Sequence, residues 1–494
     1  MEQGKSTSEL RGAAAGASPE GAGDSISADI CVIGAEPGGL AAAMAAAAFG
    51  RSVVLIERHQ LGGEPLGYGI LAQRARAAAA NRAHALRTAG VFGIQGRDPE
   101  IDPRAINQHV ANVITEVTPN FAAERFVGLG IRVIHAAGRF INKKTVAAGE
   151  QRVRARRFVI ATGAVPAAPS IPGLNSVPYF TTETIASSHE RLHNLIIIGG
   201  DPATLELAQT YSRLGSRVIV LLAGKAVADA DPELAKFLLD QLADEGIAVH
   251  ENTKVENVEG GLGRVKVNVT VGGEKHLVEG SHLLVAAGRK PATADLGLEA
   301  AGIQHDERGI KVNAGLKTSN RRVFALGEVA AAPGAQAPDY QAGVVIRRAL
   351  LHARARLDER LIPRVTFTDP ELAFVGLSEA EAAKSAKKIH VLRWPYREND
   401  RAVAEGTVVG HIKVLTDRAG KILGAGIVGA QAGELIGMWA LALSQGLNIK
   451  AMTEWVAPYP TLSEINKRAA ASYYAGRPGN PTLRKVIDFL AKFG

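Results

Sequence analysis

Residues 29–57 read DICVIGAEPGGLAAAMAAAAFGRSVVLIE, and this stretch decides the fold. It begins with a short apolar run that ends at Gly34, continues through a long Ala-rich segment, and closes with a second apolar run that ends at Glu57. Apolar runs bounded by turn residues are typical of buried strands, and the Ala-rich segment between them is long enough for a helix. The stretch therefore predicts a βαβ unit that opens at residue 28.

The same pattern returns in residues 194–222. An apolar run, NLIIIGG, is followed by a predicted helix around residues 203–214 and by a second run, RVIVLL. Two such units predict two Rossmann-like dinucleotide-binding domains, in which a glycine-rich turn and a helix N-terminus bind the pyrophosphate of the ligand.

The first glycine-rich turn, GAEPGG, departs from the Rossmann pattern at one position. Gly34 and Gly39 occupy the first and third conserved positions, but the second position is Glu36. A carboxylate there would crowd and repel a pyrophosphate, because two like charges about 4 Å apart near a protein surface repel by roughly 4 kcal/mol. Glu57 ends the second strand, where an acid that binds ribose hydroxyls is expected.

The second glycine-rich turn, GGDPAT, departs further from the pattern. Asp201 stands at the second glycine position and Thr204 at the third. The ribose-binding acid expected at the end of the following strand is replaced by Leu222. Lys225 lies just beyond and could contact a 2′-phosphate, although a solvated loop lysine is the simpler interpretation. These residues favour NADPH over NADH if a nicotinamide cofactor binds.

Residues 61–74, LGGEPLGYGILAQR, resemble the redox-disulfide helix of the pyridine nucleotide–disulfide oxidoreductases, which reads roughly GGTCxNxGCxPSK. Both cysteine positions are replaced, by Pro65 and Ile70, and the lysine that follows is Arg74. A disulfide relay needs two sulfur atoms, whereas the chain contains the single cysteine Cys31. We therefore exclude the thiol chemistry of this family within one chain, and with it lipoamide, glutathione disulfide and mercuric ion as substrates.

Further motifs in the same order resemble this family over almost the whole chain: residues 158–172 (FVIATGAVPAAPSIP), 283–291 (LLVAAGRKP), 318–329 (TSNRRVFALGEV) and 458–464 (PYPTLSE). The resemblance implies an α/β fold with two Rossmann-like dinucleotide-binding domains, one for FAD and one for NAD(P), followed by a C-terminal α+β dimerisation domain that forms a homodimer. The expected division is a disordered tail (1–27), the first part of the FAD-binding domain (28–174), an NAD(P)-binding-like domain (175–290), the second part of the FAD-binding domain (291–362), the dimerisation domain (363–478) and an amphipathic helix (479–494).

The resemblance also implies the residues of the site. The expected contacts to FAD and NAD(P)H are Gly34, Glu36, Gly38, Gly39, Glu57, Gly63, Thr162, Gly163, Gly199, Gly200, Gly288, Arg289, Gly327 and Glu328. Arg74 and Glu206 stand where the family pairs a lysine with a glutamate beside the flavin, although an ordinary buried salt bridge is an equal alternative.

The acid–base histidine of the family's His-Pro-Thr-x-x-Glu motif is Tyr459 here, whereas its glutamate is kept as Glu464. An unperturbed tyrosine has a pKa near 10, which is too high for an efficient base at neutral pH. Soluble transhydrogenases of the same family also carry Tyr-Pro-Thr at this point, and they need no thiol acid–base step. Tyr459 therefore agrees with a reaction that passes hydride only between flavin and nicotinamide.

Composition and charge narrow the setting of the protein. The single cysteine predicts a reducing cytoplasm, no apolar run is long enough to cross a membrane, and the thirteen histidines show no spaced metal-binding cluster. The net charge of +8 comes from scattered residues without a nucleic-acid motif.

The predicted C-terminal helix carries an apolar face formed by Leu483, Val486, Ile487, Leu490 and Phe493. We expect this face to dock on its own dimer; contact with a membrane surface, suggested by the basic residues Arg484, Lys485 and Lys492, is the less favoured alternative.

Two functions fit these substitutions. The first is an FAD-dependent NAD(P)H oxidoreductase that passes hydride to flavin and electrons on to a small non-thiol acceptor, such as a quinone, a dye, oxygen or a second nicotinamide. The second is a non-catalytic homodimeric scaffold or regulatory protein, suggested by the acids Glu36 and Asp201 in the two pyrophosphate turns. We favour the first function, because the loss of both cysteines and the histidine removes only the thiol–disulfide half-reaction. The sequence pattern of the flavin domain is kept.

Overall fold

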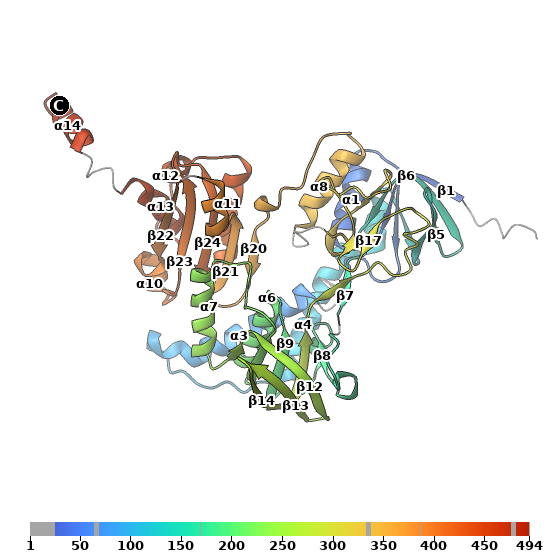
Figure 1. The fold of residues 1–494 in the computed structure, drawn as a ribbon, viewed down its shortest axis with the longest axis horizontal. Coiled ribbons are helices and arrows are strands. Elements are labelled where there is room, and N and C mark those ends of the chain that lie inside the picture. Colours follow the sequence, from blue (N-terminus) through green and yellow to red (C-terminus); the bar gives the residue numbers. More distant parts are fainter. Residues whose placement is uncertain are drawn as a thin grey trace, which may run out of the picture.

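The chain folds into three domains, each built from a sheet and helices (Figure 1). The computed structural model describes residues 25–63, 69–167, 169–331, 337–386, 388–475 and 481–493. Pro65, the predicted replacement of the first cysteine, lies outside the described residues.

The first domain is built on a sheet with the strand order β3-β2-β1-β6-β5-β4, and β19 pairs with β6. Strands β1, β2, β3, β6 and β19 are parallel, as the βαβ pattern predicts. The elements of this domain are β1 (Ser25–Ile33), α1 (Pro37–Ala48), β2 (Val53–Glu57), α3 (Ile70–Thr88), α4 (Pro103–Val117), α5 (Ala123–Gly128), β3 (Ile131–His135), β4 (Gly138–Asn142), β5 (Thr145–Ala148), β6 (Gln151–Ile160), β17 (His305–Asp306), β18 (Gly309–Ile310), β19 (Val323–Ala325) and α8 (Pro338–Ala349).

Helix α1 forms because its sequence suits both its start and its packing. Pro37 lies in the first turn, where the missing N–H has no intrahelical partner to lose. Ala42, Ala43 and Ala46 are fully buried, and their small side chains let the helix lie close to the sheet. Helices α1 and α8 share one hydrophobic core over this face of the sheet.

The second domain repeats the design. Its sheet runs β11-β10-β9-β15-β8 with parallel pairing throughout, and the antiparallel sheet β12-β13-β14 packs against one face of it through a shared core. The elements are β8 (Phe180–Thr181), β9 (Asn194–Gly199), α6 (Pro202–Arg213), β10 (Arg217–Leu222), α7 (Pro232–Asp244), β11 (Ala248–His250), β12 (Thr253–Gly261), β13 (Arg264–Val271), β14 (Glu274–Gly280) and β15 (His282–Ala286). A two-stranded ribbon, β7 (Ala164–Pro166) with β16 (Arg289–Pro291), carries the chain between the two domains.

The third domain is an antiparallel sheet, β20-β21-β24-β23-β22, whose core is shared with helices α11 and α13. Its elements are β20 (Arg364–Thr366), β21 (Glu371–Gly376), α9 (Glu379–Ser385), β22 (Ile389–Pro395), α10 (Asp400–Ala404), β23 (His411–Asp417), β24 (Ile422–Gly429), α11 (Ala432–Ser444), α12 (Ile449–Glu454) and α13 (Glu464–Ala471). Trp439 lies fully buried in this core and donates its indole N–H to Asn466 Oδ1 at 2.8 Å.

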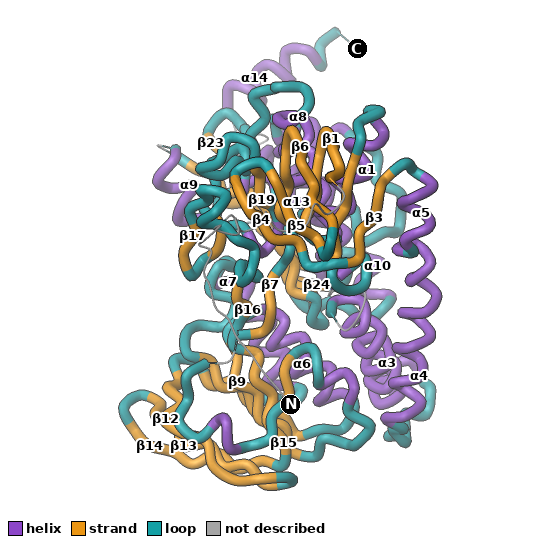
Figure 2. The backbone as a smooth tube through the Cα atoms, turned by 90° about the vertical axis from the view of Figure 1, so that its right-hand side faces the viewer, coloured by secondary structure: helices purple, strands orange, loops and turns teal. Residues whose placement is uncertain are grey.

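One feature differs from the sequence-based expectations, and two others were not predicted. Strand β1 begins at Ser25, so residues 25–27 belong to the sheet and not to the predicted tail. Helices α3 and α4 lie side by side and extend from the first domain toward the second, where α3 contacts α6 (Figures 1 and 2). Helix α14 (Pro481–Leu490) stands away from the body of the chain (Figure 1). Among the described residues, no helix is long and apolar enough to cross a membrane.

Candidate cofactor and redox sites

The first glycine-rich turn is shaped by close contact between α1 and the ends of β1 and β6. A Cβ atom on Gly34, whose φ is +97°, would lie 2.2 Å from the carbonyl oxygen of Ala161. A Cβ atom on Gly39 would lie 2.2 Å from Gly34 O, and one on Gly38 would lie 2.4 Å from Leu326 Cδ1. A side chain at Gly34 or Gly39 would meet backbone atoms and push the helix away from the sheet, whereas a side chain at Gly38 would displace the end of the Leu326 side chain.

Glu36 turns its carboxyl group into this turn. The residue is the N-cap of α1, but its side chain makes no capping hydrogen bond. Its carboxyl carbon lies 2.5 Å from the position that a Cβ atom would take on Gly63, and its Oε1 lies 3.0 Å from the corresponding position on Gly163. The carboxyl group therefore lies against both glycines, at the mouth where the Rossmann pattern places a pyrophosphate.

Glu57 lies beside the same turn. Its Oε2 accepts a hydrogen bond from Ala35 N–H at 2.7 Å, and its Oε1 accepts one from His59 N–H at 2.8 Å. A carboxylate oxygen can accept more than one hydrogen bond, so Glu57 keeps capacity for the hydroxyls of a ribose. Glu57 is thus bonded to the backbone of Ala35, the residue that directly precedes Glu36.

Arg289 and Glu328 come together from different motifs. Arg289 Nε lies 3.0 Å from Glu328 Oε2, and Arg289 Nη2 donates to Ala164 O at 2.7 Å. Glu183, which was not predicted, lies 3.7 Å from Arg289 Nη1. A carboxylate that faces the β7–β16 ribbon was not recognisable from local sequence, because residue 183 lies far from both strands in the chain.

The predicted glycines and Thr162 of this region hold the backbone in place. Gly327 N–H donates to the fully buried Gln341 Oε1 at 2.7 Å, and Thr162 Oγ1 donates to Ala292 O at 2.9 Å. Among the described residues, no heavy atom lies within 4 Å of a Cβ built on Gly288 or on Gly327, so the space next to these two Cα atoms is open.

In the second turn, Asp201 acts as a helix cap. Its Oδ1 accepts hydrogen bonds from the N–H and the hydroxyl of Thr204, both at 3.0 Å, so the carboxylate occupies the N-terminus of α6. Burial raises the pKa of Asp201. A Cβ atom on Gly199 would meet Thr204 Oγ1 at 2.3 Å, whereas Gly200 faces open space. Asp201 therefore competes for the N–H groups that a nicotinamide dinucleotide would use.

We expect Asp201→Asn to tighten NAD(P)H binding roughly ten-fold, since it removes a negative charge at the helix end but keeps an N-capping side chain. Isothermal titration of the flavin-loaded protein measures the dissociation constant. The matched control is Asp201→Ala, which also removes the charge but loses the cap, at a cost of about 1 kcal/mol of stability. An unchanged affinity in Asp201→Asn would show that the carboxylate does not oppose the cofactor.

Arg74 and Glu206 are brought together, as predicted. Arg74 Nη2 lies 3.6 Å from Glu206 Oε2, and the guanidinium carbon lies 3.8 Å from the ring centroid of Phe367. Glu206 Oε1 accepts Phe367 N–H at 2.8 Å. Burial raises the pKa of Glu206 and lowers the pKa of Arg74. Phe367, which the sequence analysis did not select, fixes the plane of the guanidinium group.

Ile70 lies one helical turn before Arg74 on α3, so the two side chains share a face. Ile70 is about half exposed and one third of the Arg74 side chain is exposed. Where the family has its second cysteine, this chain therefore presents a half-exposed apolar side chain next to the Arg74 guanidinium group.

Tyr459 and Glu464 form hydrogen bonds with other residues. Tyr459 O–H donates to Asp400 Oδ2 at 2.8 Å, and this hydrogen bond raises the pKa of Tyr459. Glu464 Oε1 lies 2.9 Å from Arg468 Nη2, one turn along α13. The raised pKa makes Tyr459 an even poorer base at neutral pH, in agreement with the sequence-based argument.

Arg213 forms a polar junction that sequence analysis missed. Its guanidinium group, almost fully buried, bonds Glu245 with both Nε (2.8 Å) and Nη2 (2.6 Å). Its Nη1 bonds Asp369 Oδ2 at 2.9 Å and Asn81 Oδ1 at 2.7 Å. Arg213 therefore connects α3, the second domain and the third domain.

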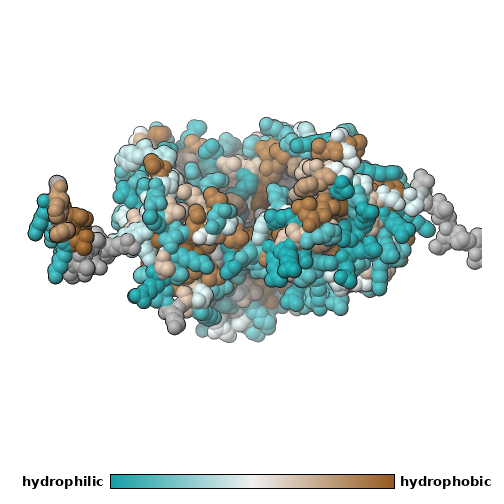
Figure 3. Space-filling view, turned by 90° about the horizontal axis from the view of Figure 1, so that it is seen from above, coloured by the Kyte–Doolittle hydropathy of each residue, from teal (hydrophilic) through white to brown (hydrophobic). Residues whose placement is uncertain are grey.

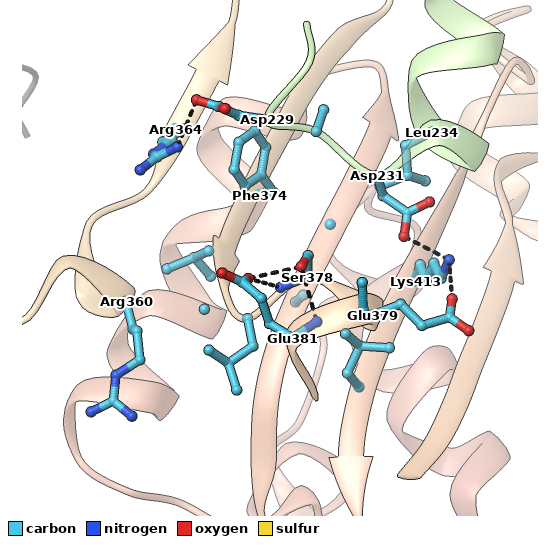
Figure 4. Close-up of a pocket in the computed structure, with 18 of the residues that line it drawn as sticks. Asp229, Asp231, Leu234, Arg360, Arg364, Phe374, Ser378, Glu379, Glu381 and Lys413 are labelled. Carbon is cyan, nitrogen blue, oxygen red and sulfur yellow. Dashed lines mark hydrogen bonds and ion pairs between the residues drawn. The ribbon is translucent and has the colours of Figure 1, made fainter. Parts of the chain in front are cut away.

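A cavity of about 910 Å³ lies between residues 228–234 of the second domain and the third domain (Figure 4). Lys413 in its wall bonds Asp231 Oδ2 at 2.7 Å and also Glu379, and Arg364 bonds Asp229 Oδ2 at 3.0 Å. These charged side chains are paired with one another, and none of the predicted cofactor-binding residues lines the cavity.

The chain matches two family descriptions. Residues 28–350 match the pyridine nucleotide-disulphide oxidoreductase model, and residues 362–470 match the dimerisation domain of the same family. The mercuric reductase of Streptomyces lividans is 32% identical over 455 residues, which cover 90% of this chain and 96% of the reductase. The dihydrolipoyl dehydrogenase of Thermus scotoductus is 33% identical over 452 residues, which cover 90% of this chain and 97% of the dehydrogenase.

Solved structures share the fold at lower sequence identity. LpdA from Mycobacterium tuberculosis superposes with a TM-score of 0.83 at 24% identity, covering 90% of this chain and 99% of LpdA. The HOCl-induced flavoprotein disulfide reductase RclA from Escherichia coli, as its Cu(II) complex, gives a TM-score of 0.79 at 23% identity, covering 89% of this chain and 99% of RclA. These two similarities support the three-domain architecture.

Proposed function

The chain belongs to the pyridine nucleotide-disulphide oxidoreductase family, and from this premise we propose that it is an FAD-dependent NAD(P)H oxidoreductase that works without a redox disulfide. Members of this family are FAD-binding, NAD(P)H-using oxidoreductases. The match to the family's dimerisation domain supports a homodimer.

One observation carries the disulfide-free part of the proposal. Cys31 is the chain's single cysteine, and it lies fully buried in strand β1. Burial raises the pKa of its thiol, so the nucleophilic thiolate is suppressed. The electrons must then leave the flavin for a small non-thiol acceptor, such as a quinone, a dye, oxygen or a second nicotinamide.

The residues at the first turn fit FAD, with Glu36 as the exception. The tight glycine turn, the start of α1 and the acid Glu57 suit the pyrophosphate and ribose of a dinucleotide. Open space beside Gly288 and Gly327 leaves room for the remainder of the ligand. Glu36 has to swing out of the turn before a pyrophosphate can enter, and this requirement lowers the affinity.

The glycine turn and Glu57 would hold FAD, which would supply the chemistry of hydride transfer between a nicotinamide and the second substrate. In this arrangement Arg74 would supply a fixed positive charge beside the reacting groups, held in place by Phe367 and Glu206. Tyr459 would position ligands through its hydroxyl group without acting as a base.

The test is an anaerobic titration of the FAD-loaded, desalted protein with NADH and with NADPH, followed by visible absorption. We expect bleaching of the flavin band. Absence of bleaching in protein that has retained flavin would contradict the proposal and favour the scaffold function, which the acids at both pyrophosphate turns would then explain.

We further expect Cys31→Ala and wild-type protein to show turnover with NAD(P)H and a dye acceptor within about two-fold of each other, because the buried thiol takes no part in the reaction. Iodoacetamide treatment of the folded wild-type protein should also leave turnover unchanged. Loss of turnover in folded, flavin-loaded Cys31→Ala, together with inhibition of the wild type by iodoacetamide, would show that the thiol takes part and would contradict the disulfide-free reaction.

A further inference from the structure

Helix α14 carries an apolar side that no part of the chain covers within the described residues. Five side chains of its last turns and the segment that follows are 49–74% exposed: Val486, Ile487, Phe489, Leu490 and Phe493. The helix lies apart from the body, and hydrophobic and hydrophilic residues occupy different parts of its surface (Figure 3). The apolar side is therefore uncovered within its own subunit, which leaves the partner subunit of the predicted dimer and a membrane surface as the two predicted partners for this face.

The opposite side of α14 is polar and mainly basic. At about 100° per residue, Arg484, Lys485, Asp488 and Lys492 fall on one arc, and the exposed apolar residues fall on the other. Three of these four side chains are cationic. A short helix with aromatic and aliphatic residues on one face and Lys and Arg on the other has the composition of a helix that lies in a membrane interface.

A second copy of the chain is less suited to cover the apolar side of α14. The family's dimerisation domain matches residues 362–470, so the match ends before α14 begins at Pro481. The family dimer is thus accounted for without this helix. A protein partner on the apolar side would also not explain why the polar side of α14 is mainly cationic. Phosphate headgroups at the edge of an acyl layer would pair with these cations.

We propose that α14 docks the protein on the surface of a bilayer that contains anionic phospholipids, with its apolar side at the acyl boundary and Arg484, Lys485 and Lys492 at the headgroups. The helix is too short to span the bilayer, so it lies in the interface plane. This docking is independent of the oxidoreductase activity.

The test is co-flotation of the full chain with vesicles of phosphatidylglycerol and phosphatidylcholine in equal parts, and with vesicles of pure phosphatidylcholine. Wild-type protein should float with the anionic vesicles at least ten-fold better than with the neutral ones, since each basic residue near an anionic surface contributes roughly five-fold. The double variant Phe489→Glu/Phe493→Glu should lose flotation. The matched control Leu262→Glu places a charge on a fully exposed leucine of the second domain and should float like wild type.

Four outcomes would overturn the proposal. The first is that wild-type protein does not float, and the second is that it floats equally with both vesicle types. The third is that the double variant still floats, which would place the lipid contact elsewhere. Light scattering provides the fourth: if the double variant is monomeric while Leu262→Glu is dimeric, a second copy of the chain covers the apolar side. Loss of flotation with the dimer intact supports docking on the membrane surface.

Discussion

Replacing Glu36 by glycine is expected to tighten FAD binding by about 100- to 1000-fold. The Glu36 carboxyl group lies against Gly63 and Gly163, in the turn where the pyrophosphate belongs. A carboxylate about 4 Å from a phosphate repels it by roughly 4 kcal/mol, which corresponds to about three orders of magnitude in the dissociation constant. Because the Glu36 side chain makes no capping bond to α1, its removal costs the helix little.

The isosteric variant Glu36→Gln separates charge from crowding. It keeps the length of the side chain but carries no charge, so it should recover most of the gain if repulsion dominates and little if the side chain simply fills the turn. Flavin fluorescence titrations at one fixed ionic strength give the three dissociation constants, since surface electrostatics are screened by salt. Wild-type protein that already holds FAD as tightly as Glu36→Gly would contradict this account of Glu36.

The regular parts of the fold were predictable because their causes are local. The helix predicted for the Ala-rich segment of the first βαβ unit is α1, Pro37–Ala48, since the glycine turn, the proline in the first turn and the alanine run all act within a few residues. The parallel order of β1, β2 and β6 follows from the βαβ connection, which allows few alternatives.

Asp201 carries a local signal that the sequence analysis did not use. The sequence analysis noted only that Asp201 stands at the second glycine position of the turn, and the structure shows that its carboxylate also accepts the N–H of Thr204. Asp followed directly by Pro202 is the N-cap and first-turn pattern of a helix, so the capping role could have been predicted from the sequence. Glu36 also precedes a proline, but glutamate is a poor N-cap, and its side chain reaches across the turn instead.

Long-range pairings were not predictable from spacing alone. Arg74 and Glu206 were paired through the family resemblance, and Tyr459 and Glu464 were selected in the same way. Arg74 and Glu206 are in contact because α3 and α6 bring their side chains together. The partner of Tyr459 is Asp400, which lies far from it in the sequence, so local spacing could not predict this hydrogen bond. Nothing in the local sequence distinguishes Arg213 from the other arginines of the chain.

Replacing Arg213 by methionine is expected to lower the melting temperature by roughly 5–15 °C, which corresponds to about 3–5 kcal/mol. Arg213 is the shared partner of Asn81, Glu245 and Asp369, and its loss leaves the carboxylate of Glu245 buried without its cation. Burial alone would lower the pKa of Arg213, but the hydrogen bonds to Glu245 and Asp369 raise it, so the arginine stays charged in this junction.

Two controls test whether the uncompensated charge is the cause. The double variant Arg213→Met/Glu245→Leu removes the remaining buried charge and should be more stable than Arg213→Met alone. Arg360→Met breaks an exposed pair with Asp358 and should change the melting temperature by a few degrees at most. Differential scanning calorimetry is suitable because a multidomain chain need not unfold in one step.

The contacts of Arg213 also predict which part of the protein unfolds first on heating. Arg213 and its partners come from α3, from the C-terminal ends of α6 and α7 and from the loop before β21. Loss of the arginine therefore weakens the contact among the three domains and leaves each domain's own core intact. In Arg213→Met, calorimetry should therefore resolve a transition at lower temperature ahead of the main one, and limited proteolysis should cut between the domains. A single unshifted transition would show that the domain cores, and not this buried ion network, hold the three domains together.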